Sequence, residues 1–90
     1  MLEREVLRQV RELLQWRGWK VYRIQQSMGS HKGFSDLVAA KQGRVVFIEC
    51  KGSNGKLSYY QQKFRDELLE EKVPYWLISD IEQLNDLLNY

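Results

Sequence analysis

Residues 33–51 read GFSDLVAAKQGRVVFIECK and carry most of the information about the architecture. Two apolar runs, 34–41 and 44–51, lie on either side of a short polar turn. The turn contains Gln42-Gly43, and glycine readily adopts the positive φ of a tight hairpin. Both faces of the two runs carry apolar side chains, which is typical of strands in the middle of a sheet. This stretch therefore predicts a central, buried β-hairpin.

Charged residues share one face of this predicted hairpin. A two-residue loop places Asp36 opposite Glu49, with Cβ atoms roughly 4.5–5.5 Å apart. Side chains alternate along a strand, so Lys51 lies on the same face as Glu49. Two carboxylates this close repel each other unless a cation compensates them. An exposed, charged strand face is the alternative, but charged groups on buried strands are rarely present without a partner or a function.

Composition places the chain among small globular proteins. Its ninety residues, 1–90, are expected to form a single domain. Hydrophobic residues make up 43% of the chain and aromatic residues 12%, which is enough for one core. No apolar run approaches the length of a membrane span, and the charged, amphipathic N-terminal segment does not resemble a signal peptide. We therefore expect no membrane partner.

The chain has one cysteine, Cys50, and one histidine, His31. A single cysteine cannot form a disulfide within the chain, which favours a reducing, intracellular setting. These counts exclude a cysteine-rich zinc site and disfavour a histidine-based metal site. Any metal would have oxygen ligands, which favours Mg²⁺ or Mn²⁺.

Charge is distributed unevenly along the chain. Residues 1–45 contain nine Lys and Arg against four Asp and Glu, a balance of +5, whereas residues 46–90 have a balance of −3. The nine basic residues are Arg4, Arg8, Arg11, Arg17, Lys20, Arg23, Lys32, Lys41 and Arg44. This asymmetry indicates a nucleic-acid-binding face, although a solvated helix face produces the same count.

Hydrophobic periodicity and turn residues predict an alternation of helices and strands. The expected elements are a helix at 2–17, strands at 19–25, 34–41 and 44–51, a helix at 58–72, a strand at 75–79 and a short helix at 80–89. Gly18 is placed to end the first helix, and Pro74 disfavours helical geometry at Val73. Capping-box patterns at Ser58-x-x-Gln61 and Ser79-x-x-Glu82 open the two later helices. This order predicts an α/β fold with a mixed sheet flanked by helices.

Glu3 occupies an unusual position in the first helix. The apolar stripe of that helix contains Val6, Leu7, Val10 and Leu14. At 100° per residue, Glu3 lies about 20° from Val10, inside the stripe, whereas Glu5 lies on the solvent side. We therefore expect Glu3 to point toward the sheet. A carboxylate favoured by the helix dipole, or a frayed helix end, is the alternative explanation.

The pattern Asp36…Glu49-Cys50-Lys51 resembles the D-(x)n-E-x-K motif of the PD-(D/E)XK nuclease superfamily. Its surroundings are similar to the VRR-NUC family, in a stand-alone phage or bacterial form. The segments that carry this resemblance are GFSDL at 33–37, VFIECKG at 46–52, LSYYQ at 57–61, LL at 68–69 and VPY at 73–75. The opening Glu3-Arg4-Glu5-Val6 also resembles the first helix of archaeal Holliday-junction resolvases. The resemblance covers nearly the whole chain and implies a restriction-endonuclease-like core with the order α-β-β-β-α-β.

Two positions depart from the family pattern. Ser35 stands where the family often has proline, a residue that shapes the strand entry and does no chemistry. Cys50 stands where an aliphatic residue is usual, and it faces away from Glu49, so we interpret it as a small core residue.

The resemblance assigns roles to named residues. It implies that Asp36 and Glu49, with the backbone carbonyl of Cys50, bind Mg²⁺ or Mn²⁺, and that Lys51 orients water or stabilises developing charge. Glu3 would bind a second ion or an outer-shell water. Gln61 matches the glutamine that accompanies the E-x-K strand. His31 and Lys32 would contact a DNA phosphate, or would simply belong to a polar loop.

These assignments predict a metal-dependent, structure-selective DNA endonuclease. We expect a homodimer, because a two-fold dimer matches the near two-fold symmetry of a four-way (Holliday) junction. The alternatives are a monomeric flap or nicking nuclease and a non-catalytic nucleic-acid-binding module on a nuclease-like fold. The expected location is the cytoplasm of a bacterial cell, with the protein encoded by the cell or by a phage.

Overall fold

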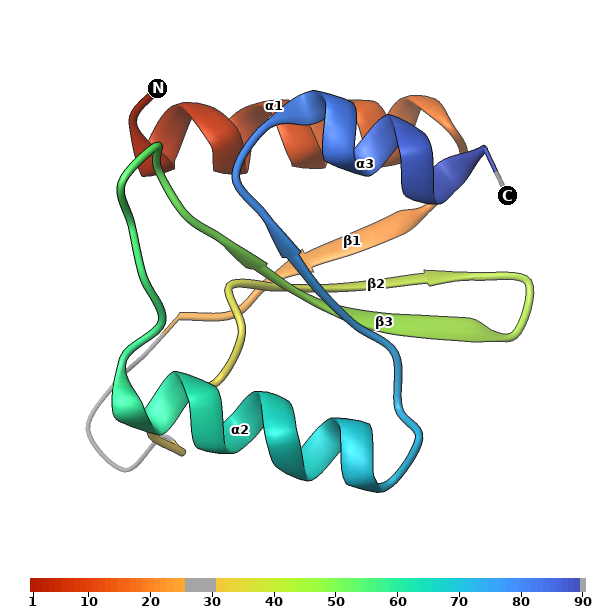
Figure 1. Cartoon of the computed structure of the whole chain (residues 1–90). Coiled ribbons are helices and arrows are strands. Elements are labelled where there is room, and N and C mark those ends of the chain that lie inside the picture. Colours follow the sequence, from red (N-terminus) through yellow and green to blue (C-terminus); the bar gives the residue numbers. More distant parts are fainter. Residues whose placement is uncertain (26–30, 90) are drawn as a thin grey trace.

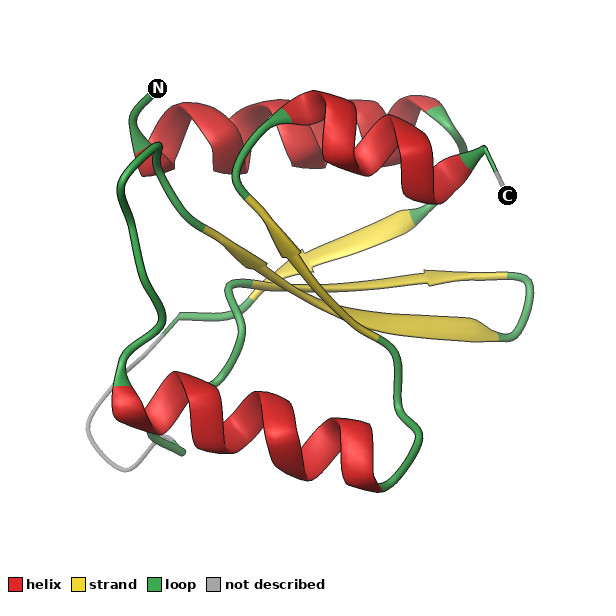
Figure 2. Ribbon diagram, viewed as in Figure 1, coloured by secondary structure: helices red, strands yellow, loops and turns green. Residues whose placement is uncertain are grey.

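A mixed four-stranded sheet forms the centre of the molecule, in a computed structural model that describes residues 1–25 and 31–89. The strands are β1 (Lys20–Arg23), β2 (Leu37–Lys41), β3 (Arg44–Cys50) and β4 (Tyr75–Ile78), in spatial order β1-β2-β3-β4. The first two pairings are antiparallel and the β3–β4 pairing is parallel. Helices α1 (Glu3–Trp16) and α3 (Ile81–Leu88) lie on one side of the sheet, and α2 (Tyr59–Glu70) lies on the other (Figure 1, Figure 2). The predicted α/β class and element order are confirmed.

The central hairpin has the predicted register. Leu37 pairs with Ile48 and Lys41 pairs with Arg44, which leaves Gln42 and Gly43 as a two-residue loop. Their φ values of 50° and 82° are both left-handed, as a type I′ turn requires. The strand β2 begins at Leu37, later than predicted, because the preceding residues form a loop.

Local hydrogen bonds explain where β2 begins. The buried Ser35 hydroxyl donates to the Leu37 carbonyl at 3.0 Å, which bends the chain just before the strand. The Ile24 amide still donates to the Asp36 carbonyl at 2.8 Å, so the loop stays attached to the end of β1. Asp36 is therefore anchored to the sheet although it precedes the strand.

The middle of one face of the sheet is buried. The α1 stripe of Val6, Val10 and Leu14 is completely buried, and it belongs to one core with Leu37 and Ile48. The α3 residue Leu84 completes that core. Burial of each such side chain contributes about 1.5–3 kcal/mol, so this layer holds the sheet rigid beneath the charged face.

The opposite face is only partly covered, which corrects the prediction that both faces of the hairpin are buried. Phe64 of α2 stacks against Phe34, Phe47 and Tyr75, with ring centroids 4.7–6.5 Å apart. Beyond this aromatic cluster, Val45 at the hairpin end remains 44% exposed. The short α2 reaches only part of the face, and the apolar residues outside its reach stay in contact with solvent.

The helix ends follow the predicted residues except at the start of α3 and at the end of α2. Gly18 has φ 89° after α1, and Ser58 caps α2 together with Gln61. The predicted Ser79–Glu82 capping box is wrong, because Asp80 is the N-cap of α3 and its side chain accepts from the Gln83 amide at 3.1 Å. Aspartate and serine are equally good N-caps, so the sequence allowed either start. Helix α2 ends at Glu70, two residues before the predicted end, and Lys72 takes a left-handed φ of 61°.

Among the described helices, none combines the length and the apolar character that crossing a bilayer would require.

Candidate active site

Two carboxylates meet at the end of the hairpin where β2 begins. Asp36 directly precedes the Leu37–Ile48 pair, so the register continues to Asp36 opposite Glu49. The Cys50 amide donates to Asp36 Oδ2 at 2.9 Å, which holds this carboxylate across the gap between the strands. The Glu49 side chain is only 2% exposed. The structure therefore brings together the two carboxylates that the sequence predicted to be neighbours.

Glu49 has donors on one oxygen only. Its Oε2 lies 3.3 Å from Lys51 Nζ and accepts from Gln61 Nε2 at 3.2 Å. Its Oε1 is buried and has no hydrogen-bond partner among the described residues. Burial, followed by the charge of Asp36, raises the pKa of Glu49 to about 7, although the nearby Lys51 acts in the opposite direction. A buried carboxylate with an unsatisfied oxygen is costly, and it indicates a site that a ligand completes.

Glu3 reaches the same site from the first turn of α1. Its Oε1 lies 3.7 Å from Lys51 Nζ, and its side chain is 55% exposed. Glu3 therefore points in the direction that its helical phase predicted, and it lies at the rim of the site. Glu5 instead accepts from the Leu2 amide at 3.1 Å and so caps its own helix.

The start of α1 is held against the loop that follows β3. The Ser53 amide donates to the Met1 carbonyl at 3.1 Å. A Cβ on Gly52 would lie 2.9 Å from that carbonyl oxygen and 3.0 Å from the Glu3 amide nitrogen, so a larger residue would push the helix away. The absence of a side chain at Gly52, directly after Lys51, thus allows Glu3 to approach the lysine.

Gln61 links the site to the N-terminus of α2. Its Oε1 accepts from the Ser58 amide at 2.8 Å while its Nε2 donates to Glu49, so it serves as helix cap and site residue together. Asp36 and Gln61 line a cavity of about 230 Å³, and Lys32 also lines it. Ser58 and Tyr60, at the N-terminus of α2, line the same cavity, and the partial positive charge of a helix N-terminus favours an anion.

The two basic residues expected near a phosphate take different positions. Lys32 lines the cavity with its Nζ 5.0 Å from the centre of the Tyr60 ring. His31 packs against Phe64, with ring centroids 5.8 Å apart, and does not line the cavity. The structure therefore groups Lys32 with the carboxylates and places His31 beside the aromatic cluster.

Gly33 is a residue whose structural importance the sequence reasoning missed. It has φ 82°, and a Cβ there would lie 2.2 Å from the Tyr60 carbonyl oxygen. The loop before β2 thus lies directly against the first turn of α2, and this contact positions Gln61 relative to Asp36. A glycine at the start of a predicted strand is a recognisable signal for such close backbone approach.

The residues present fit a hard divalent cation. Asp36 and Glu49 supply carboxylate oxygens, and the free Oε1 of Glu49 has no competing donor in the described part of the chain. No group of three His, Cys, Asp or Glu side chains suitable for a metal occurs within residues 1–25 and 31–89. Further ligands would therefore be backbone carbonyl, water or phosphate oxygens, as is usual for Mg²⁺. The Cys50 side chain is fully buried on the other face of the sheet, and burial raises the pKa of its thiol.

We expect Glu49 to make the metal-free protein less stable as the pH rises. Its pKa is 4.5 when unperturbed and about 7 in the fold, so its stabilising contribution is complete below pH 4.5 and is lost as the pH passes 7. The unfolding free energy of Glu49→Gln, relative to wild type, should therefore rise by up to about 3 kcal/mol between pH 4.5 and 8. Urea unfolding in EDTA at several pH values measures this difference. A pH-independent difference would show that Glu49 titrates normally.

Comparison with known families agrees with this geometry. The family model for the archaeal Holliday junction resolvase (Hjc) matches residues 2–71, which include α1, the hairpin and α2. The matched region contains all the residues of the carboxylate site. No curated protein and no solved structure matches the chain. The match extends over more than half of the sequence, and the four-stranded sheet with its flanking helices is consistent with a restriction-endonuclease-like resolvase fold. The chain therefore belongs to the archaeal Holliday junction resolvase family of nucleases.

Proposed function

We propose that this protein is a metal-dependent DNA endonuclease that resolves four-way junctions as a homodimer. The observation that carries the proposal is the buried Glu49, which faces Asp36 and lies 3.3 Å from Lys51 Nζ. The two carboxylates supply oxygen ligands for a metal ion, and the Lys51 ammonium supplies a positive charge. This combination suits the hydrolysis of a phosphodiester. Membership of the Holliday junction resolvase family supports the reaction and the substrate class. The finer likeness to the VRR-NUC family stays a prediction from the sequence motifs.

Hydrolysis of a phosphodiester adds a water oxygen to phosphorus and breaks one P–O bond, and the departing oxygen takes up a proton. In this proposal Asp36 and Glu49 hold a divalent cation, with the Cys50 carbonyl as a third protein ligand. Such a cation supplies charge stabilisation at the phosphate and lowers the pKa of water. Gln61 fixes the Glu49 carboxylate through its amide, so that the second oxygen of Glu49 remains available.

Lys51 has a separate role in the proposed reaction. Its ammonium group lies between Glu49 and Glu3, and its side chain is 14% exposed, so the group is positioned rather than free in solvent. We assign it to orienting the attacking water and to stabilising the negative charge that develops on phosphate oxygens. Lys32 and the first-turn amides of α2 would hold an adjoining phosphate at the cavity.

Dimerisation follows from size and symmetry in this proposal. One 90-residue chain neutralises few phosphates, and affinity for DNA depends steeply on that number. Two subunits double the contacts and present two sites to opposite strands of a two-fold junction. We propose a cytoplasmic location, where a junction formed between cellular or phage DNA molecules would be found.

The test measures both the cleavage of DNA substrates and the mass of the protein in solution. Labelled junction, flap and linear duplex of the same sequence are incubated with the protein in Mg²⁺ and in EDTA, and sedimentation equilibrium is run at micromolar concentration. We expect junction cutting in Mg²⁺ only and a mass about twice the 10.8 kDa of the chain. A monomer that prefers flaps would favour a flap nuclease. Binding without cutting in any metal would favour a non-catalytic binding module.

We expect Lys51→Ala to lower the cleavage rate by about 10²–10³-fold, because the positioned ammonium group near Glu49 is lost. DNA binding should persist, since the other phosphate contacts remain. Single-turnover cleavage and a binding isotherm in EDTA measure the two effects separately. Cleavage at the wild-type rate would reduce Lys51 to a structural partner of Glu49.

Glu3 and Glu5 form a matched pair in the same helix. Glu3→Gln should lower activity about 10–100-fold, the usual cost of removing a group that orients a site residue. Glu5→Gln should be nearly neutral, because the Glu5 carboxylate accepts from the Leu2 amide, and a glutamine oxygen can accept the same bond. Equal losses in the two variants would show that the charge of the helix start, and not the contact with Lys51, matters.

A further inference from the structure

The hairpin carries a second like-charged pair, at its turn. Lys41 and Arg44 are direct partners across β2 and β3. Each lies two residues along its strand from a buried residue, Ala39 or Val46. All four therefore lie on the sheet face that α1 and α3 cover. Two positive charges directly opposite each other destabilise an antiparallel pair. The negatively charged Asp36–Glu49 pair is its counterpart, and it lies at the other end of the hairpin and on the other face of the sheet.

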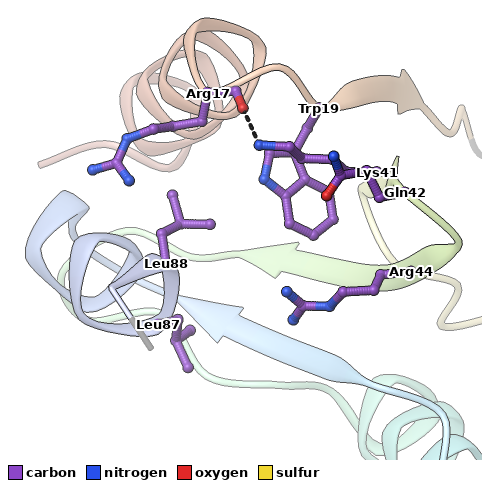
Figure 3. Close-up of a pocket in the computed structure, with 7 residues that line it drawn as sticks. All are labelled: Arg17, Trp19, Lys41, Gln42, Arg44, Leu87 and Leu88. Atoms are coloured by element: carbon purple, nitrogen blue, oxygen red, sulfur yellow. Dashed lines mark hydrogen bonds between the residues drawn. The ribbon is translucent and has the colours of Figure 1, made fainter.

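A third positive charge joins them at a pocket of about 150 Å³. Figure 3 shows Arg17, at the end of α1, together with Trp19 and the two hairpin residues, and shows Leu87 and Leu88 of α3 on the remaining side. Among the residues that the structure describes, no acidic side chain lines this pocket. In the described part of the chain, the guanidinium groups of Arg17 and Arg44 form no ion pair.

Two contacts hold the Lys41 ammonium and the Arg44 guanidinium in place without neutralising them. Lys41 Nζ donates to the Arg17 carbonyl at 2.6 Å, which ties the hairpin turn to the end of α1 (Figure 3). The Arg44 guanidinium lies 5.5 Å from the centre of a Trp19 ring. This cation–π contact places the Arg44 guanidinium over the indole ring and leaves it charged. The Lys41 ammonium and the Arg44 guanidinium are therefore held by the fold, and neither pairs with a carboxylate of the described residues.

We propose that this pocket binds a phosphate group, and that the source is a phosphate of the DNA backbone. Guanidinium N–H groups match the geometry of phosphate oxygens, and the ammonium of Lys41 adds a point charge. Trp19, Leu87 and Leu88 supply an apolar wall that strengthens electrostatic attraction. Three of the nine basic residues of the N-terminal half meet here, so the pocket accounts for part of the charge asymmetry.

The position of the pocket separates it from the carboxylate site. Arg44 and Glu49 are five residues apart on β3, about 17 Å along the strand, and they point to opposite faces. A phosphate in this pocket is therefore not the one that is cut. Assigning it to DNA rests on the proposed function, and it would then belong to a different stretch of the substrate.

The first arm of the test asks whether the pocket binds phosphate at all. Thermal unfolding is measured in sodium phosphate and in sodium chloride of equal ionic strength, at one pH. Wild type should gain stability in phosphate by mass action, and Arg44→Gln and Arg17→Gln should each lose most of this gain. Arg8→Gln is the control, because it removes the same charge from α1 at a residue paired with Glu12. The half-buried Arg17 side chain makes no hydrogen bond in the described part of the chain, so this variant is expected to fold.

The second arm measures DNA binding in EDTA, without cleavage, over a range of salt concentrations. The slope of log affinity against log salt should fall by about one in Arg44→Gln or Arg17→Gln and should be unchanged in Arg8→Gln. Loss of the phosphate effect with an unchanged slope would support the pocket and assign it to a free phosphate compound. Absence of both effects would overturn the inference. Failure of wild type to bind DNA would instead contradict the proposed function, and the phosphate arm would still test the pocket.

Discussion

Asp36→Asn and Glu49→Gln should each lower the rate of junction cleavage by about 10³-fold or more. Each substitution removes a carboxylate charge with little change in volume, and the Cys50 amide or the Gln61 amide retains an oxygen acceptor in the variant. A cation that stabilises the reacting phosphate contributes several kcal/mol, and every 1.36 kcal/mol changes the rate about tenfold. The loss should therefore appear in the chemical step while the fold is retained.

Metal binding and cleavage must change together for this interpretation to hold. Calorimetric titration with Mn²⁺ should show binding to wild type and a large loss of affinity in both variants. Asp66→Asn is a suitable control, because it removes an exposed carboxylate that pairs with Arg65 on α2. Unchanged Mn²⁺ affinity in Asp36→Asn and Glu49→Gln would refute the metal assignment, even if cleavage were lost.

Gly33→Ala should cost about 4 kcal/mol of unfolding free energy or more. The φ of 82° disfavours any residue with a Cβ, and this Cβ would also lie 2.2 Å from the Tyr60 carbonyl oxygen. This contact joins two backbone segments. Relieving it therefore requires the loop before β2 or the first turn of α2 to move. Losses of this size are exceptional for one substitution and arise from steric conflicts of this kind.

Gly43→Ala separates the two causes. Gly43 also has φ 82°, but an added Cβ meets nothing within 4 Å, so this variant should cost only about 1–2 kcal/mol. Urea unfolding of both variants gives the comparison directly. Gly33→Ala should also weaken cleavage, since the turn that moves carries Gln61. Equal destabilisation by the two variants would mean that the contact with Tyr60 is unimportant.

The local features of this protein were predictable because they depend on short stretches of chain. A two-residue turn at Gln42-Gly43 sets the register, and the register alone brings Asp36 and Glu49 together. Helical phase likewise directed Glu3 toward the sheet. Side-chain direction along a strand or helix follows from backbone geometry, which does not require knowledge of the remaining chain.

Other features depend on segments that are distant in sequence. The position of α2 on its face of the sheet depends on the packing of Phe64 against its aromatic partners. This position determines how much of that face is covered and how exposed Val45 is. The close approach of Gly33 to Tyr60 and of Gly52 to Met1 follows from the same packing. No local pattern encodes these distances, because they result from the simultaneous packing of several elements.

The positive pocket illustrates the same division. Its hairpin pair of Lys41 and Arg44 follows from the register, which the turn at Gln42-Gly43 establishes. Its wall joins the end of α1 to Leu87 and Leu88 of α3, which lie more than forty residues beyond Arg44. Register depends on short-range geometry and could be read from the chain. The joining of α1, the hairpin and α3 depends on burial of a shared core, a property of the whole fold.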